Sequence, residues 1–171
     1  MSYQVVQADI ERDKGTILRF WRENSPKSLD SKYRWIYENN PAGKPMVWMI
    51  RHVESGECVG ITALFPRRMS TRNGTVLAGV AGDLFVNEKH RTLGPAVKLL
   101  RSTLTAVHEG KVDLIYTFPN KAADGVVRAA GYRRLGKLVR LVKVLRTARY
   151  FHKLGLHRFL ISCAEPGARF R

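Results

Sequence analysis

The chain has 171 residues, 44% of them hydrophobic, which is enough to bury the core of one domain of ordinary composition. Its 30 basic residues outnumber 14 acidic ones, and the formal net charge of +16 suits an anionic ligand or surface. The sequence has no apolar run near the roughly 20 residues that span a bilayer and no signal-peptide pattern. Its two cysteines are too few for a disulfide framework, so we expect a cytoplasmic domain with free thiols.

The first quarter of the chain predicts one strand and two helices. Residues 3–8 alternate in polarity, which is typical of a strand, and Asp9 is placed to cap the segment that follows. Apolar residues at helical spacing then predict a helix that ends near residue 24, and a second helix that begins at Ser28 or Asp30 and closes before Pro41. The aromatic residues of these helices either pack in the core or line a ligand-binding cleft; they are Trp21, Tyr33, Trp35 and Tyr37.

The middle of the chain predicts an antiparallel meander. Residues 46–50, 58–69 and 75–86 are strand-like, and the turns between them are short. The turn at 72–74 contains the Asn-Gly pair that is typical of a tight hairpin. After this meander the pattern changes to helix, strand, helix and strand, with the last strand predicted at 132–145. The sequence thus predicts an antiparallel meander followed by an α/β segment.

The segment between the strand at 76–86 and the next helix indicates an anion-binding turn. We expect Gly94 to adopt a backbone conformation that is barred to other residues, and Pro95 suits the first position of a helix, where its missing N–H costs nothing. Apolar residues then recur at helical spacing, at Val97, Leu100, Leu104 and Val107. Because the free N–H groups and the dipole of a helix start favour an anion, we interpret this turn as a phosphate cradle.

The turn and a second motif resemble the GNAT superfamily of N-acetyltransferases. Arg91–Ala96 has the Arg-x-x-Gly-x-Ala pattern of that family's pyrophosphate-binding loop. Phe118–Tyr132 is similar to its later motif, in which an Asn follows a strand and precedes a short helix and a Gly-aromatic pair. Asn120 and Gly131 are separated as the family separates them. The resemblance covers residues 3–146 and implies a mixed α/β (α+β) fold, with a mostly antiparallel sheet, flanking helices and a splayed central pair of strands.

The resemblance also implies where an acetyl-CoA or other acyl-CoA cosubstrate binds, and it implies no metal. The family's cofactor arm runs beside the strand that here contains Leu84, Phe85 and Val86. The residues around its pyrophosphate are Arg91, Thr92, Leu93, Gly94, Pro95 and Ala96. Asn120 either contacts the cofactor or fixes the splayed strands, and the alternative is a plain helix cap.

Asp83 lies in an otherwise apolar strand, on the same face as Ala81 and Phe85. A carboxylate is costly to bury there without a partner, and the GNAT family often has a base at this part of the strand. We interpret Asp83 as the catalytic base or as the carboxylate that binds the amine; the alternative is an ion pair with an arginine. His90, in the turn, is a weaker candidate for proton transfer, and a solvated side chain is its alternative.

The chain departs from the family at one catalytic position. Four residues before the Gly-aromatic pair, many members have a Tyr that is assigned to protonate the departing thiolate, and this chain has Val127. Neither Tyr116 nor Tyr132 stands at the corresponding position, so the sequence does not identify the group that protonates the thiolate. This departure motivates a second interpretation, in which the domain has weak or no catalysis and binds CoA or a protein partner.

We predict an enzyme that transfers an acyl group from acyl-CoA directly to an amine, since neither Cys58 nor Cys163 has a histidine nearby in sequence that would favour an acyl-cysteine. The acceptor, the acyl length and the oligomeric state are not defined by the sequence, and a homodimer is one option. A basic module for nucleic acid or an anionic membrane is a third interpretation. We do not expect nucleic-acid binding as the main function, because no known reading motif is present.

Residues 147–171 lie outside the resemblance, and we treat residues 1–146 as one acyl-CoA-binding domain. The tail mixes apolar and basic residues, which predicts an amphipathic helix packed on the domain or on a neighbouring chain. A peripheral membrane or protein contact, disorder, and the start of a further domain in a longer chain are the alternatives.

Overall fold

The computed structural model describes residues 2–24, 30–139 and 141. Residues up to Leu135 form one compact unit, and all of the elements below belong to it. In chain order they are β1 (Tyr3–Gln7), α1 (Lys14–Asn24), α2 (Asp30–Tyr33), the π-helical turn η1 (Arg34–Glu38), β2 (Met46–His52), β3 (Cys58–Thr71), β4 (Gly74–Val86), the 3-10 turn η2 (Glu88–His90), α3 (Leu93–Thr103), α4 (Thr105–His108), β5 (Leu114–Tyr116) and α5 (Asp124–Ala129).

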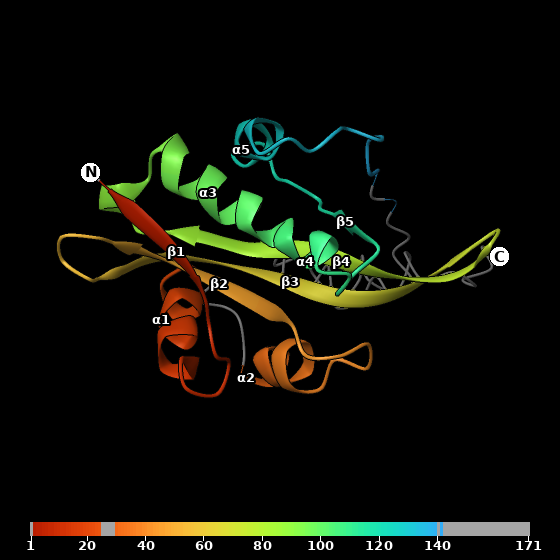
Figure 1. Cartoon of the computed structure of the whole chain (residues 1–171), viewed down its shortest axis with the longest axis horizontal. Coiled ribbons are helices and arrows are strands. Elements are labelled where there is room, and N and C mark those ends of the chain that lie inside the picture. The colour runs from red at the N-terminus through yellow and green to blue at the C-terminus, as the bar shows by residue number, and fades with distance from the viewer. Residues whose placement is uncertain (1, 25–29, 140, 142–171) are drawn as a thin grey trace, which may run out of the picture. The chain divides into compact units, whose positions relative to one another are not determined.

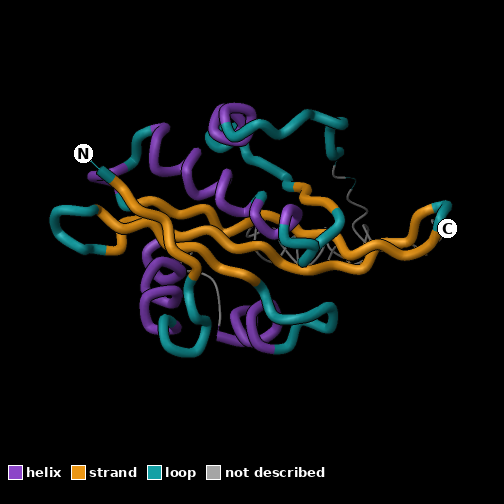
Figure 2. Tube along the Cα trace, in the orientation of Figure 1, coloured by secondary structure: helices purple, strands orange, loops and turns teal. Residues whose placement is uncertain are grey.

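The sheet has five strands in the order β1-β2-β3-β4-β5 (Figure 2). The first four pair antiparallel, and β5 joins the edge of β4 in parallel. In Figure 1, α1 and α2 lie below the sheet, whereas α3 and α5 lie above it. This arrangement confirms the predicted mixed fold with a mostly antiparallel sheet and flanking helices.

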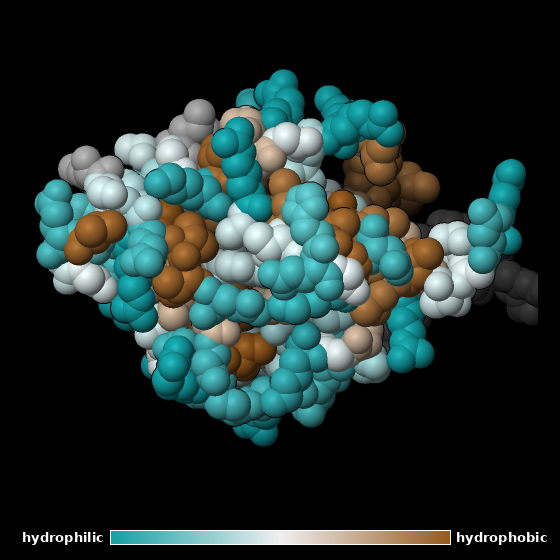
Figure 3. Space-filling model, viewed as in Figure 1, coloured by the Kyte–Doolittle hydropathy of each residue, from teal (hydrophilic) through white to brown (hydrophobic). Residues whose placement is uncertain are grey.

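The two faces of the sheet are packed by two separate cores, because side chains alternate along each strand. On β2, Val47 and Met49 face the core built with α1, α2 and η1. Trp48 and Ile50 face the other core, built with α3 and α5. Burial on both faces explains why the first nine residues of β3, Cys58–Pro66, form a nearly continuous apolar run, whereas the last five are half-buried or exposed. The face of the molecule shown in Figure 3 is accordingly largely hydrophilic, with hydrophobic residues in separate groups.

The predicted hairpin between β3 and β4 is confirmed. The register pairs Thr71 with Gly74, so the loop consists of Arg72 and Asn73 alone. Gly74 has φ of +118°, a backbone conformation that favours glycine.

Among the helices of the described residues, none combines the length and apolar character needed to cross a membrane.

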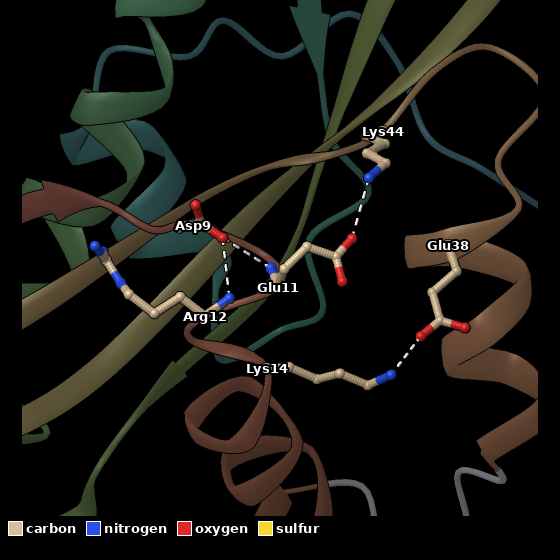
Figure 4. A network of polar contacts seen from close by, with 6 residues as sticks. All are labelled: Asp9, Glu11, Arg12, Lys14, Glu38 and Lys44. Carbon is tan, nitrogen blue, oxygen red and sulfur yellow. Dashed lines mark hydrogen bonds and ion pairs between the residues drawn. The ribbon is translucent and has the colours of Figure 1, made fainter.

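The turn from β1 into α1 is held by polar contacts that Figure 4 shows from close by. The Asp9 carboxylate accepts the backbone N–H groups of Glu11 and Arg12 at 3.0 and 2.9 Å, as its predicted capping role requires. Ion pairs then join Lys44 to Glu11 and Lys14 to Glu38, which lies at the end of η1. All of these groups are partly or largely exposed, so each pair contributes at most about 1 kcal/mol.

The last predicted strand is wrong over the part of it that the structure describes. Residues 132–139 and 141 form no strand, and the side chains of Leu135, Leu138 and Leu141 are 85%, 75% and 90% exposed. An apolar alternation becomes a strand only where a neighbour accepts its backbone hydrogen bonds, and the edge strand β5 has three residues. Residue 140, residues 142–145 and the predicted tail helix at 147–171 lie outside the described residues, and the boundary at 146 stays a prediction.

Candidate functional site

The strands β4 and β5 diverge where the resemblance implied a splayed pair. Their pairing covers only Ala78–Val80 and Leu114–Tyr116, whereas β4 continues to Val86. The Thr117 hydroxyl makes the last contact, donating to the Ala81 carbonyl oxygen at 2.8 Å. Beyond that point β4 has no strand on this side among the described residues, and its edge borders open space.

Two grooves occupy this space. The first, of about 340 Å³, is lined by Leu84, Val86, Arg91, Thr92, Ala96, Asn120, Ala122, Ala123 and Val126. The second, of about 270 Å³, is lined by Ala81, Gly82, Asp83, Leu84, Phe85, Leu100, Thr117, Phe118, Pro119, Asn120 and Ala123. They share Leu84, Asn120 and Ala123 as walls. Predicted residues from β4, from the turn and from the second motif therefore line two adjacent grooves.

The predicted phosphate cradle is the first turn of α3. The helix begins at Leu93, after Thr92 in extended conformation, so Gly94 and Pro95 are its second and third residues. First-turn N–H groups have no acceptor within a helix, which leaves those of Leu93 and Gly94 available, while Pro95 has no N–H to leave unpaired. Gly94 and Pro95 are not among the groove-lining residues, and Pro95 is buried.

The expected special backbone conformation at Gly94 is wrong. The glycines with positive φ are at positions 43, 56, 74, 110 and 131, and Gly94 is helical. What Gly94 provides is room, because a Cβ built there has no heavy atom within 4 Å apart from its neighbours in the chain and helix. Absence of a side chain keeps the helix end open to an approaching anion.

Arg91 and Asn120 both stabilise backbone at the mouth of the first groove. The Arg91 guanidinium donates from Nε and Nη2 to the Val86 carbonyl oxygen at 3.4 and 3.3 Å, which ties the turn back to the end of β4. Asn120 accepts the Ala123 N–H at 2.9 Å with its side-chain oxygen and so caps the turn before α5. Its side chain also lines both grooves, so a capping role and a ligand contact are compatible.

Asp83 occupies a bulge in β4. Ala63 pairs with Gly82 and Ile61 with Phe85, which leaves Asp83 and Leu84 opposite Thr62 alone. Asp83 has φ of +50°, the single non-glycine residue with positive φ in the described chain. Its Oδ2 accepts hydrogen bonds from the Tyr37 hydroxyl at 2.7 Å and the Trp21 indole N–H at 2.9 Å. The alternative of an ion pair with an arginine is wrong for the described residues.

The pKa of Asp83 is raised from its ordinary value of 3.8, because burial penalises the carboxylate more than its hydrogen bonds from Tyr37 and Trp21 favour it. The folded state therefore holds this proton more tightly than the unfolded state. The stability that Asp83 contributes is present below its unfolded pKa and is lost as pH rises through its folded pKa.

We expect the free energy of unfolding of the wild type, relative to Asp83→Asn, to fall as pH rises from about 3.8 and to level off above the folded pKa. Asparagine has no proton to release, so the difference between the two curves isolates Asp83 from the other carboxylates. Urea unfolding of both proteins at a series of pH values measures it. A difference that rises with pH would contradict the raised pKa.

The donors to Asp83 belong to a buried aromatic cluster of Trp21, Tyr33, Tyr37 and Phe65. Tyr33 and Tyr37 are stacked with ring centroids 4.6 Å apart, and Trp21 meets both rings edge to face. This places three of the four helical aromatics in the core, whereas Trp35 is 60% exposed. Sequence reasoning missed the role of Trp21 and Tyr37, since nothing local to either residue indicates an acceptor on β4.

The hydroxyl of Tyr33 is buried without a hydrogen-bond partner among the described residues, and burial raises the pKa of Tyr33 to about 12. We expect Tyr33→Phe to stabilise the fold by about 1 kcal/mol, because an unpaired buried hydroxyl loses its water and gains nothing. Urea unfolding at neutral pH measures the change. A loss of stability would show that the hydroxyl has a favourable partner.

The remaining candidates for proton transfer lie away from the grooves. His90 Nδ1 is 3.0 Å from the Tyr3 hydroxyl. Val127, at the position where many family members have the tyrosine, is 8% exposed on the core-facing side of α5. The Tyr132 hydroxyl is 3.1 Å from Thr103 Oγ1. No tyrosine lines either groove within the described part of the chain. In the same residues, no three His, Cys, Asp or Glu side chains are grouped so as to hold a metal ion.

The sequence profile of the acetyltransferase (GNAT) domain matches residues 16–137, which include β4, the turn, α3 and α5. The chain therefore belongs to the GNAT acetyltransferase domain family. A search of curated protein sequences found no significant match.

Solved structures share the fold at low sequence identity. A predicted acetyltransferase from Clostridium acetobutylicum, solved with acetyl-CoA, has a TM-score of 0.64 at 14% identity, over 82% of this chain and 96% of that one. A putative acetyl transferase from Pyrococcus furiosus has a TM-score of 0.64 at 16% identity, over 83% and 100%. The glucosamine-6-phosphate N-acetyltransferase from Arabidopsis thaliana has a TM-score of 0.59 at 14% identity, over 84% and 99%.

Proposed function

We propose that this chain is an N-acyltransferase that binds acetyl-CoA or a related acyl-CoA and passes the acyl group directly to an amine. The observation that carries the proposal is the pair of grooves with shared walls, which lead from the start of α3 along the open edge of β4 to Asp83. Membership of the GNAT family supports the same activity, as does the acetyl-CoA complex of the Clostridium acetobutylicum neighbour. A cytoplasmic location stays a prediction.

The chain's residues fit an acyl-CoA at both ends of the grooves. At the first groove, the N–H groups that open α3 and the exposed Arg91 side chain suit a pyrophosphate, and the open space at Gly94 leaves room for it. Along β4, Leu84 and Val86 offer an apolar wall to a pantetheine arm, at a part of the strand that pairs with no described strand on the β5 side. Asn120 lies between the grooves and offers a side-chain amide to the same ligand.

Asp83 is proposed as the base. An alkyl amine is an ammonium ion at neutral pH, and it must lose one proton before its nitrogen can attack the thioester carbonyl. The Asp83 carboxylate takes that proton, and the neutral nitrogen attacks the thioester carbonyl. The C–N bond forms as the C–S bond breaks, the sulfur leaves as a thiolate, and the nitrogen releases its second proton to solvent to give the amide. Solvent returns a proton to the thiolate, since the described groove residues include no tyrosine to do so.

The environment of Cys58 favours direct transfer over an acyl-cysteine. The Cys58 thiol is buried and donates to the Gly60 carbonyl oxygen at 3.6 Å. Burial raises the pKa of this thiol, so it is a poor nucleophile at neutral pH. Cys163 lies outside the described residues.

Release of free CoA from acetyl-CoA, measured with a panel of small amines, amino sugars, aminoglycosides and peptides, tests the proposal. Turnover with any amine supports it. The second candidate, a CoA-binding domain without catalysis, is favoured by the buried Val127 and predicts thermal stabilisation by CoA with no turnover. If neither acetyl-CoA nor CoA raises the unfolding midpoint, the acyl-CoA proposal fails, and salt-dependent binding to nucleic acid or anionic vesicles is measured next.

A further inference from the structure

The Asp83 carboxylate is held from one side only. Both of its hydrogen bonds, from Tyr37 on η1 and Trp21 on α1, end on the same oxygen, Oδ2. Within the described residues Oδ1 accepts no hydrogen bond, although Asp83 lines the second groove. A carboxylate has acceptor capacity on both oxygens, so Oδ1 is available to a donor that enters this groove.

The two donors come from different helical elements, are buried, and contact each other: the Trp21 indole N–H, which donates to Asp83, also donates to the Tyr37 hydroxyl at 3.4 Å. Tyr37 is 0% exposed and Trp21 is 4% exposed, and their rings are packed edge to face with centroids 5.7 Å apart. They fix the side chain of a residue whose backbone, with φ of +50°, is itself strained. A strained non-glycine conformation persists only where its surroundings over-determine it, and such positions concentrate at functional sites.

We propose that Tyr37 and Trp21 are positioning residues, which hold Asp83 in one orientation as a carboxylate so that Oδ1 can take the proton of an ammonium ion in the second groove. This inference rests on the proposed function, and it defines the acceptor as a cationic amine that reaches Asp83 from that groove. The two donors act through Asp83 and have no contact with substrate.

Two charged or titratable groups of the described chain act on the pKa of Asp83. The charged and titratable groups that act on it are the Tyr37 phenol and, more weakly, the Lys32 ammonium of α2, both of which lower its pKa. The groove neighbours Thr117 and Phe118 carry no charge. Burial, together with the adjacent carboxylate, raises the pKa of Tyr37 well above its ordinary value, so its hydroxyl stays a donor across the working pH range.

Tyr37→Phe in the full chain tests the inference, because it deletes one hydroxyl and keeps the ring. We expect the acidic limb of the pH profile of kcat/KM to move to higher pH, with about tenfold lower activity on that limb and recovery toward the plateau above it. The 13C titration of the Asp83 carboxyl, assigned with Asp83→Asn, should move in the same direction. Trp21→Phe, which removes the other donor, is the second variant and should move both readouts likewise.

Tyr33→Phe is the matched control, since it removes a hydroxyl from the ring stacked on Tyr37 that has no bond to Asp83. Its pH profile and its Asp83 titration should equal those of the wild type. If Asp83 titrates at the same pH in the wild type, Tyr37→Phe and Trp21→Phe, the positioning role is overturned. If instead the wild type transfers to no amine, the proposed function fails, and the 13C titration still decides whether these donors control Asp83.

Discussion

Gly94→Glu is expected to lose the stabilisation that acetyl-CoA gives to the wild-type chain. A ligand at 100 times its Kd raises the free energy of unfolding by about 2.7 kcal/mol. The substituted carboxylate would lie at the second residue of α3, where the free N–H groups favour an anion, and would repel the phosphates while occupying their space. Thermal unfolding with and without acetyl-CoA and free CoA, at fixed salt, measures the loss.

The substitution should not itself damage the fold. The position is exposed, a Cβ there meets nothing, and an acidic residue in the first turn of a helix is favourable. Gly15→Glu is a matched control, because Gly15 is likewise an exposed second residue of a helix of 11 residues with open space at its Cβ. It lies on α1, which covers the opposite face of the sheet (Figure 1). Stabilisation retained by Gly94→Glu, or lost in Gly15→Glu, would contradict the phosphate cradle.

The parts of the fold that the sequence predicted are those with local causes. The Asn-Gly pair defines the β3–β4 hairpin. Pro95 lies in the first turn of α3, although the helix begins two residues before the predicted first position. The apolar alternation at 132–139 is equally local, but it forms no strand there, because a strand depends on a neighbour that the alternation does not reveal. Local pattern predicted where elements begin and end better than which elements find a partner.

The candidate site likewise combines features with local causes, which the sequence predicted, and features that depend on distant partners, which it did not. The unusual environment of Asp83 was predictable, since a carboxylate in an apolar strand is costly to bury without a hydrogen-bond or charge partner. Its left-handed backbone was not, because that conformation follows from a register shift between β3 and β4, and the prediction placed the special conformation at Gly94. Its donors, Tyr37 and Trp21, are 46 and 62 residues away in sequence, so their convergence is a property of the packed helices alone.

Asp83→Asn is expected to lower kcat/KM for amine acylation by about 10²- to 10⁴-fold, the usual contribution of a general base. The amide oxygen of asparagine can still accept from Tyr37 and Trp21, so the aromatic cluster and the bulge should keep their structure. Stabilisation by acetyl-CoA should be retained, because the phosphate-binding residues are untouched. The measurement is CoA release across pH, together with thermal unfolding in the presence of the ligand.

Asp113→Asn is the control for this loss. Asp113 precedes β5 and accepts the Leu77 N–H at 2.7 Å, so it is also a carboxylate with a structural hydrogen bond, but it lines neither groove. Its activity should stay within a few-fold of the wild type. The residual rate of Asp83→Asn should also lose the acidic limb of the profile, since the group that titrates there is gone. If Asp83→Asn keeps both the acidic limb of the pH profile and the wild-type rate, the base is another group. If Asp83→Asn loses acetyl-CoA binding as well as activity, Asp83 belongs to the cofactor site.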